Sequence, residues 1–396
     1  YKPVPWDNVY LPGWQPMSSE EGTMAEALVQ RGYHTGFFSD VPHYFVPGMN
    51  FTRGFGQWAY IRGHSEDRYR ATAHADPVQV ARYWSKSGEE RVRAHLANVR
   101  PYQPEEEWPT ARTFRAAIEF VEQNQRHHQD KPFYLYVDSF APHESWEAPI
   151  HYYDLYESRE KREPICITVP YGPLNLNPQL EERLPSIRAN YAGLVTLVDT
   201  WFGKLIDTID RLGLAENTMI FFVADHGTNF AENPDGVTGK PADYMYPGTM
   251  DLPLLVRHPT GVGAGTQCGE FVYTLDIPAT ISEVTGVVPV DGIEGQSLLP
   301  LVTGEGAFQS RAYLTCRYGN SVWYKDRQNW FFSDAEFQHP RLFDFESDPD
   351  CHHEITDKGA ERIETAKTRI LDDAGGLLRV YRRQNSTDAI GRPEFK

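Results

Sequence analysis

The chain has 396 residues, of which 40% are hydrophobic and 13% aromatic, and its 55 acidic and 38 basic side chains give a formal net charge of −17. This composition excludes a disordered chain, and the length allows one large core with a smaller second unit. The acidic excess disfavours nucleic acid and anionic membranes as partners, and no apolar run is long enough to predict a membrane span.

The cysteines and the first residues carry little information about the compartment. The chain contains no CxxC pair, so we expect neither a zinc knuckle nor a dense disulfide framework, while one or two bridges and four reduced thiols both stay open. Residues 1–6 contain no initiator methionine and no signal-peptide core. We therefore expect a processed or truncated chain, and periplasmic, secreted and cytoplasmic locations all stay open.

Three helix-then-strand units follow one another along the chain. Each joins a helical pattern to a short apolar run that is typical of a strand. The first helix begins with a capping box, in which Thr23 is the N-cap and Glu26 reaches back to it. The predicted strands cover residues 33–38, 132–140 and 218–224, and we expect the third to be buried. The alternation predicts an α/β fold, with a mostly parallel or mixed central sheet sandwiched by helices.

The other segments differ in character. Residues 64–110 and 144–185 are rich in charge, proline and aromatic side chains, which indicates long insertions over one rim of the sheet. After Gly304, short strand-like pieces and a late helix near residues 360–371 predict a smaller C-terminal α+β domain.

Two side chains of metal-ligand type follow the third predicted strand directly. Asp225 and His226 stand side by side, and Gly227 lets the backbone turn sharply. In open α/β sheets, ligands bind beyond the carboxyl ends of the strands, which makes this pair a candidate site. A turn in which Asp225 caps a following helix would use the same residue types.

Several segments in the same order resemble the sulfatase family, within the alkaline-phosphatase-like superfamily of metal-dependent esterases. Residues 198–227 are similar to the family's helix-strand-metal unit nearly residue for residue. Further similar segments are residues 23–35, 140–143, 239–240, 251–257, 274–280, 292–301 and 341–349. Each motif is weak alone, but together they cover almost the whole chain in register.

The resemblance implies hydrolysis of a small-molecule or carbohydrate sulfate ester by a formylglycine, whose hydrated aldehyde attacks sulfur. It also implies one divalent cation, calcium or magnesium, with manganese left open by the imidazole. By motif match, Asp225 and His226 supply two metal ligands, while His143 and Lys240 bind the sulfate as catalytic donors. For Asn229 we expect a turn residue without a firm role.

The chain departs from the family pattern in two places. Residues 1–22 contain neither the Cys/Ser-x-Pro-x-Arg nucleophile motif nor the two further metal-binding acids. We therefore expect an N-terminally truncated catalytic domain over residues 1–305, without its first strand, and a small domain over residues 306–396. The second departure is Asp40, at a position where many members carry a lysine; His43 is the candidate replacement donor.

Two alternatives follow from these departures. Because Asp40 reverses the local charge, a phosphodiester or phosphonate monoester hydrolase on the same fold stays open. The other alternative is a non-catalytic sulfatase-like protein that binds carbohydrate. Its aromatic candidates, which we expect to pack inside the insertions instead, are Trp84, Trp108, Trp146, Tyr152 and Tyr153. Substrate identity and oligomeric state are not determined by these patterns.

Overall fold

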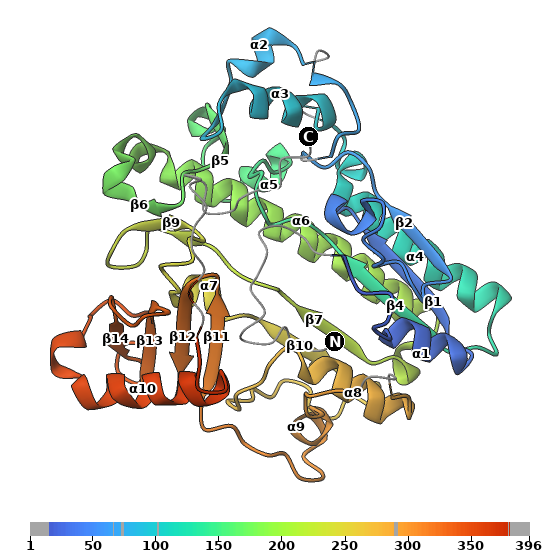
Figure 1. Ribbon diagram of the computed structural model, residues 1–396. Helices are drawn as coiled ribbons and strands as arrows, with labels where there is room; N and C mark the ends of the chain where they lie inside the picture. The colour runs from blue at the N-terminus through green and yellow to red at the C-terminus, as the bar shows by residue number, and fades with distance from the viewer. Residues whose placement is uncertain are drawn as a thin grey trace.

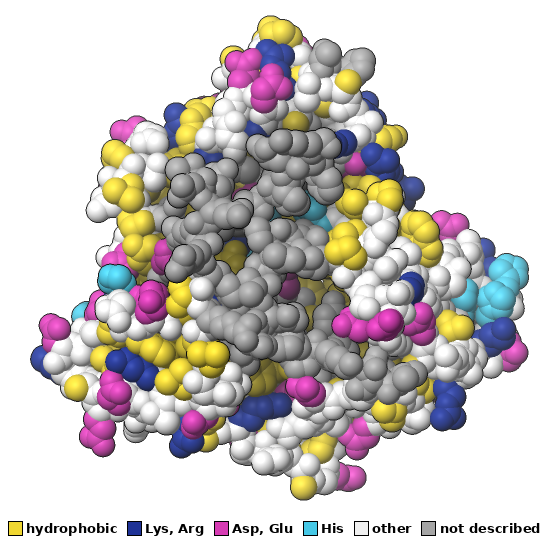
Figure 2. Space-filling model, viewed as in Figure 1, with side chains coloured by type: hydrophobic (Ala, Val, Ile, Leu, Met, Phe, Trp, Pro, Cys, Tyr) yellow, Lys and Arg dark blue, Asp and Glu magenta, His cyan; other side chains and the backbone are white. Residues whose placement is uncertain are grey.

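The computed structural model describes residues 16–378 and 380, except residues 66, 73–74, 101–102 and 289–291. Residues 1–15 thus lie outside the described residues. They make up most of the segment 1–22, in which the sequence contains no nucleophile motif. Within the described part, no helix is long and apolar enough to cross a membrane. On the face shown in Figure 2, acidic and basic side chains are interspersed around the rim, so the acidic excess does not form one patch there.

A parallel three-stranded sheet contains the first two predicted strands. Its strands are, in order, β2 (Gln57–Tyr60), β1 (His34–Ser39) and β4 (Phe133–Asp138). Ser39 of β1 lies opposite Asp138 of β4, so the loops after both strands leave the sheet at the same edge. Helix α1 (Met24–Gln30) precedes β1, and its predicted capping box is present: Glu26 N donates to Thr23 Oγ1 at 3.0 Å.

Two long helices form the main core, and the first of them covers this sheet. They are α4 (Pro109–His127) and α6 (Leu184–Arg211), which pack against each other. Their buried side chains include Phe120, Leu197 and Trp201. In Figure 1, α6 runs through the middle of the molecule and links the strands to the insertions. The helical pattern expected before the third predicted strand is confirmed as the C-terminal part of α6, where buried apolar side chains recur as a stripe.

The third predicted strand is β7 (Ile220–Val223), and it pairs antiparallel with β10 (Leu254–Arg257). The prediction of a buried strand is wrong. Ile220 and Phe222 pack against the main core, but the alternate residues point to the other face, and Val223 is 41% exposed. The described strands of this region therefore form a parallel sheet of β2, β1 and β4 and a separate antiparallel pair of β7 and β10.

The two predicted insertions join each other. Strand β3 (Tyr83–Ser85) from the first pairs parallel with β5 (Ile165–Thr168) from the second. Their helices are α2 (Pro77–Val80), α3 (Glu89–Asn98) and α5 (Ile150–Tyr153). The side chains of Trp108, Trp146 and Tyr153 are buried, as expected for aromatic residues packed inside the insertions. A small antiparallel sheet follows, made of β6 (Gly172–Pro173), β9 (Val237–Gly239) and β8 (Asn229–Phe230).

The C-terminal part is an antiparallel sheet with a helix, as the sequence predicted. Its strands are β11 (Leu314–Tyr318), β12 (Ser321–Lys325), β13 (Asn329–Asp334) and β14 (Arg341–Asp344). Helix α10 (Ala360–Asp373) packs against β12. The connecting helices are α7 (Pro247–Met250), α8 (Asp276–Thr285) and α9 (Leu299–Thr303).

The core of this C-terminal sheet also contains residues from before position 305. Trp330 Nε1 donates to Met245 O at 2.8 Å, and Tyr246 packs against Phe332 and Phe343. The division at residue 305 therefore stays a prediction, and a shared hydrophobic cluster crosses it. All four cysteines are free thiols.

Candidate functional site

Three of the predicted site residues meet in one cluster. Lys240 Nζ lies 2.5 Å from Nε2 of His143 and 3.1 Å from Nε2 of His226. The two imidazole rings are 5.7 Å apart, centroid to centroid. The residues come from the loops after β4, β7 and β9, which the sheets bring together from distant parts of the chain.

The loop after β4 is fixed by contacts on both sides of His143. The backbone N–H of Phe140 donates to Asp40 Oδ1 at 2.7 Å, which ties this loop to the loop after β1. The N–H of His143 donates to the carbonyl of Phe140 at 2.9 Å, and the two rings pack at 4.3 Å. His143 is thus held in a tight turn, with its side chain 29% exposed.

His226 is held as a neutral imidazole with a defined tautomer. Its Nδ1 lies 2.9 Å from the carbonyl oxygen of Gly227, which can only accept, so Nδ1 carries the hydrogen. Burial, and then the charge of Lys240, lower the pKa of His226. The Nε2 lone pair therefore points to the ammonium group of Lys240 and accepts from it.

Gly227 and Asn229 fix the loop after β7. A Cβ atom on Gly227 would lie 2.1 Å from the carbonyl oxygen of Gly248, so only glycine fits there. The expectation that Asn229 is a turn residue is wrong: it is fully buried in β8, and its Nδ2 donates to Gly239 O at 3.0 Å and Thr249 Oγ1 at 2.7 Å. Gly239 directly precedes Lys240 in the chain. The hydrogen bond from Asn229 to Gly239 therefore fixes the backbone next to Lys240 relative to the loop after β7.

Glu144 belongs to the cluster, and the sequence analysis missed it. Its Oε2 lies 3.0 Å from His143 Nδ1 and 3.7 Å from Lys240 Nζ, and its Oε1 accepts from the Tyr171 hydroxyl at 2.5 Å. Burial acts to raise the pKa of Glu144, but hydrogen bonds and charges from His143, Lys240 and Tyr171 outweigh it and hold this pKa well below its usual range. The carboxylate is therefore ionised and acts only as an acceptor.

Asp225 lies at the outer rim of the cluster. Its side chain is 88% exposed, and its Oδ1 accepts from the backbone N–H of His226 at 2.8 Å. The helix-capping alternative is wrong, because the next element is the short strand β8 and not a helix. The Asp225 Oδ2 atom lies 3.7 Å from His226 Nε2, so the two ligand atoms are near each other.

The pair fits two positions of a divalent-cation site. An exposed carboxylate oxygen offers free lone pairs to a hard cation, and the Nδ1–H bond of His226 to a carbonyl is the support that metal-binding imidazoles usually have. Across the described residues, no group of three or more His, Cys, Asp or Glu side chains is placed to hold a metal ion. Asp225 and His226 alone would therefore be an incomplete ligand set.

Two carboxylates lie nearby at the ends of β1 and β4: Asp40 is buried and Asp138 is half-buried. Burial raises the pKa of Asp40 to about 7 and that of Asp138 to about 6. Asp138 Oδ2 accepts from Ser39 Oγ at 3.4 Å. His43 lies on the 3-10 helix η1 (Pro42–Phe45), directly after β1, and is half-buried. The sequence singled out Asp40 for its charge, but its burial is a property of the fold.

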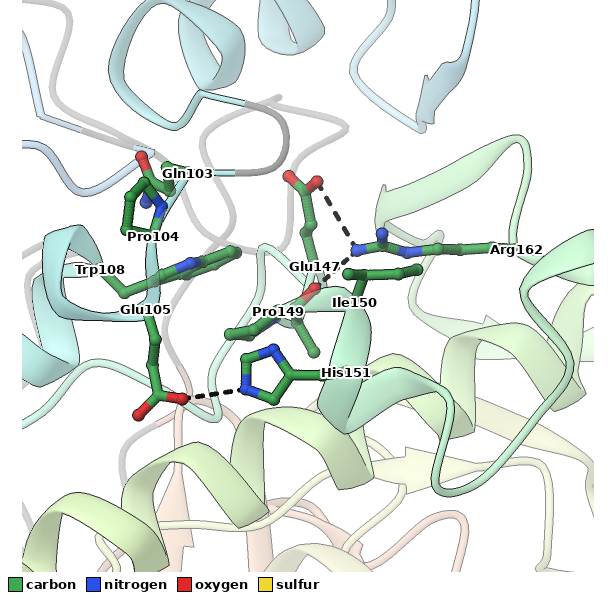
Figure 3. A pocket seen from close by; sticks show the side chains of 10 residues that line it. Gln103, Pro104, Glu105, Trp108, Glu147, Pro149, Ile150, His151 and Arg162 are labelled. Atoms are coloured by element: carbon green, nitrogen blue, oxygen red, sulfur yellow. Dashed lines mark hydrogen bonds and ion pairs between the residues drawn. The ribbon is translucent and has the colours of Figure 1, made fainter.

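One cavity adjoins the cluster, and a second cavity adjoins the first. The smaller, of about 40 Å³, is lined by Asp40, His143, Trp108 and Glu147, among others. The larger, of about 240 Å³, shares Trp108 and Glu147 with it. In Figure 3, Trp108 and Arg162 lie on opposite sides of this larger cavity, and Arg162 Nη2 lies 3.7 Å from Glu147 Oε1. The larger cavity is therefore separated from His143 by the smaller one.

Family models match most of the chain. The model described as Sulfatase matches residues 5–287, and the model described as N-sulphoglucosamine sulphohydrolase, C-terminal, matches residues 241–372. The Arylsulfatase of Clostridium perfringens is 26% identical over 282 residues, which cover 63% of this chain and 54% of that protein. The Arylsulfatase K of Xenopus laevis is 24% identical over 321 residues, which cover 70% and 58%. The chain thus spans little more than half the length of these two relatives.

Solved structures share the fold. The phosphonate monoester hydrolase of Agrobacterium radiobacter has a TM-score of 0.65 at 19% identity, covering 91% of this chain and 82% of that one. A protein solved in complex with its substrate D-glucosamine-2-N,6-O-disulfate has a TM-score of 0.63 at 16% identity, covering 91% and 84%. At these identities the likeness concerns the fold alone.

Proposed function

The chain belongs to the sulfatase family, and from this premise we propose that it is a metal-dependent hydrolase of small-molecule or carbohydrate sulfate esters. The observation that carries the proposal is the contact of one ammonium group, that of Lys240, with the Nε2 atoms of His143 and His226. Preorganised donors that converge on one point stabilise the charge that develops on an ester oxygen during hydrolysis.

The residues have separate roles in this proposal. Lys240 binds the non-bridging oxygens of the ester, because its side chain is 11% exposed and its charge is weakly screened. His143, whose Nε2 lies 2.5 Å from Lys240 Nζ, holds a proton together with the lysine and delivers it to the leaving oxygen. His43, on the adjoining 3-10 helix η1, is a further candidate donor to the substrate.

Asp225 and His226 would hold the divalent cation, calcium, magnesium or manganese, and His226 Nε2 would then give its one lone pair to the cation in place of the hydrogen bond from Lys240. When bound, the cation supplies Lewis-acid stabilisation of the ester oxygens. The formylglycine that the family uses as nucleophile has no candidate among residues 16–378, where none of the four cysteines is followed by the Pro and Arg of the motif. The roles proposed for the described residues are binding, orientation and proton transfer.

Asp40 favours a second candidate, hydrolysis of phosphonate monoesters or phosphodiesters. Its buried carboxylate lines the same small cavity as His143, at a position where many family members have a cation. Without that cation the site has one fewer positive group to hold a sulfate. The third candidate, carbohydrate binding without catalysis, loses part of its support, because three of its five aromatic side chains are buried and the other two, Trp84 and Tyr152, are half-buried.

The test is a substrate panel with product analysis. The full natural chain is incubated with an aryl sulfate, an aryl phosphonate monoester and a phosphodiester, each with calcium, magnesium or manganese and with a chelator. Release of sulfate that the chelator abolishes supports the proposal. Release from the phosphorus esters alone would replace it with the second candidate, and no metal-dependent turnover of any ester would contradict both.

A further inference from the structure

The buried side chain of Glu144 lies next to both groups that carry the proton in the proposed function, the His143 imidazole and the Lys240 ammonium group. It is 6% exposed, whereas the His143 side chain is 29% exposed and faces the site. One oxygen, Oε2, lies within 3.0 Å of His143 Nδ1 and 3.7 Å of Lys240 Nζ. A buried carboxylate in this place is costly unless it is paired, so its position is tied to these two partners.

The acceptors around His143 determine which ring nitrogen carries the hydrogen. Nδ1 lies 2.8 Å from the backbone oxygen of Glu144 and 3.0 Å from its Oε2. Neither oxygen can donate, so Nδ1 is the donor and Nε2 keeps its lone pair in the neutral ring. That lone pair points to Lys240 Nζ at 2.5 Å. The backbone oxygen is the nearer acceptor, and the carboxylate adds a charged contact on the same nitrogen.

Tyr171 fixes the orientation of the carboxylate. Its hydroxyl donates to Glu144 Oε1 at 2.5 Å, which leaves Oε2 for His143 and Lys240. The phenol ring lies against Gly239, where a Cβ atom would come within 2.2 Å of the ring, and the ammonium group of Lys86 lies 3.6 Å from the ring centroid on its face. The tyrosine is therefore held from two sides, and it has little freedom to release the carboxylate.

We propose that Glu144, oriented by Tyr171, is a positioning residue that locks His143 in the Nδ1–H tautomer and aims its Nε2 at Lys240. This inference rests on the proposed function, because it explains how the proton-transferring pair is held. The tautomer is nevertheless a property of the resting protein, so it can be measured without any turnover. Partners that orient a metal-binding imidazole typically change activity or metal affinity 10- to 100-fold when they are removed, and we expect an effect of this size at His143.

The chain contains a matched control three residues further on. Glu147 is also buried, and it also accepts from a histidine and a tyrosine: His95 Nε2 lies at 2.7 Å and the Tyr83 hydroxyl at 2.7 Å. His95 is 2% exposed and belongs to the insertion core, not to the cluster. Replacing either glutamate by glutamine removes one buried charge from the same kind of triad.

The test is the ¹⁵N and ¹H spectrum of histidine-labelled protein, with His143 assigned by loss of its signals in His143→Asn. In the unmodified protein and in Glu147→Gln, we expect a protonated, downfield-shifted Nδ1–H and an unprotonated Nε2 at His143. In Glu144→Gln we expect the Nδ1–H proton to shift upfield and the two nitrogen shifts to converge. Tyr171→Phe, which keeps the ring and removes only the hydroxyl, should give an intermediate change.

The outcomes separate this inference from the proposed function. If Glu144→Gln leaves the His143 shifts as they are in Glu147→Gln, the backbone carbonyl alone holds the ring and the proposal is wrong. If the shifts change as expected, the positioning role stands, whether or not the ester panel gives turnover. With an active enzyme, kcat should fall about 10- to 100-fold in Glu144→Gln, with a smaller change in KM. An unchanged kcat would contradict a contribution of this positioning to proton transfer, whereas the chemical shifts test the positioning itself.

Discussion

Lys240 and His143 are joined by a close polar contact, with Nζ 2.5 Å from Nε2. The two residues are 97 positions apart, and the contact joins the loop after β4 to the loop after β9. Because His226 Nε2 also accepts from Lys240, one ammonium group lies between two imidazole lone pairs. This arrangement concentrates a positive charge where the ester oxygens would lie in the proposed function.

Lys240→Met should remove this charge while it keeps most of the side-chain volume. We expect kcat/KM for a sulfate ester to fall at least about 100-fold, as on loss of an oxyanion-stabilising donor. The measurement is steady-state kinetics on the full natural chain, with the exposed Lys358→Met as the control. Equal activity in the two variants would remove Lys240 from the reaction.

Asp225→Asn should weaken cation binding without unfolding the protein, because its side chain is 88% exposed. In the unmodified chain, millimolar calcium, magnesium or manganese should raise the melting temperature, since a ligand that binds the folded state stabilises it. We expect this rise to be lost or strongly reduced in Asp225→Asn, measured by thermal unfolding with each cation and with a chelator. A rise as large as in the unmodified chain would show that Asp225 is not a ligand.

Gly227→Ala should disrupt the loop after β7. The new Cβ would lie 2.1 Å from the backbone oxygen of Gly248, so the backbone must move. We expect the free energy of unfolding to fall by about 3 kcal/mol, together with loss of activity. Gly203→Ala is the control: Gly203 is in α6 with no atom within 4 Å of its Cβ position, and there alanine should stabilise the helix by up to about 1 kcal/mol. Denaturant unfolding of both variants measures the contrast, and similar changes in both would contradict the steric argument.

Asp40→Asn should stabilise the protein at alkaline pH. The pKa of Asp40 is raised from 3.8 to about 7, so the folded state binds its proton more tightly than the unfolded state does. The stabilising contribution is complete below the unfolded pKa and is lost as the pH rises through the folded pKa. At pH 8 we therefore expect Asp40→Asn to be more stable than the unmodified chain, by at most about 4 kcal/mol, with a gap that closes toward pH 4.

Urea unfolding at several pH values measures this gap. Asp334→Asn provides a control of opposite sign, because hydrogen bonds from Gln338, His339 and Glu336 outweigh partial burial and lower the pKa of Asp334. Its stabilising contribution is present above the unfolded pKa and is lost in acid, so Asp334→Asn should be less stable than the unmodified chain at neutral pH. If the stability difference between Asp40→Asn and the unmodified chain did not change with pH, burial would not raise the pKa of Asp40.

The amino-acid sequence alone determined the family, the three helix-then-strand units, and four residues of the cluster region. It could do so because these features are local: the capping box at Thr23, the stripe in α6, and the Asp225-His226-Gly227 run at the end of a strand are patterns of neighbouring residues. Patterns of neighbouring residues predicted the burial of β7 wrongly, because burial depends on which other segments cover each face of the sheet.

Only the tertiary structure decided how the cluster works. The distances that join Lys240 to two histidines, and the hydrogen bond of Tyr171 to Glu144, connect segments that the sheets bring together from far apart. The raised pKa of Asp40 likewise comes from burial by distant side chains. Side-chain distances and desolvation are set by the packing of the whole chain, so no pattern of neighbouring residues contains them.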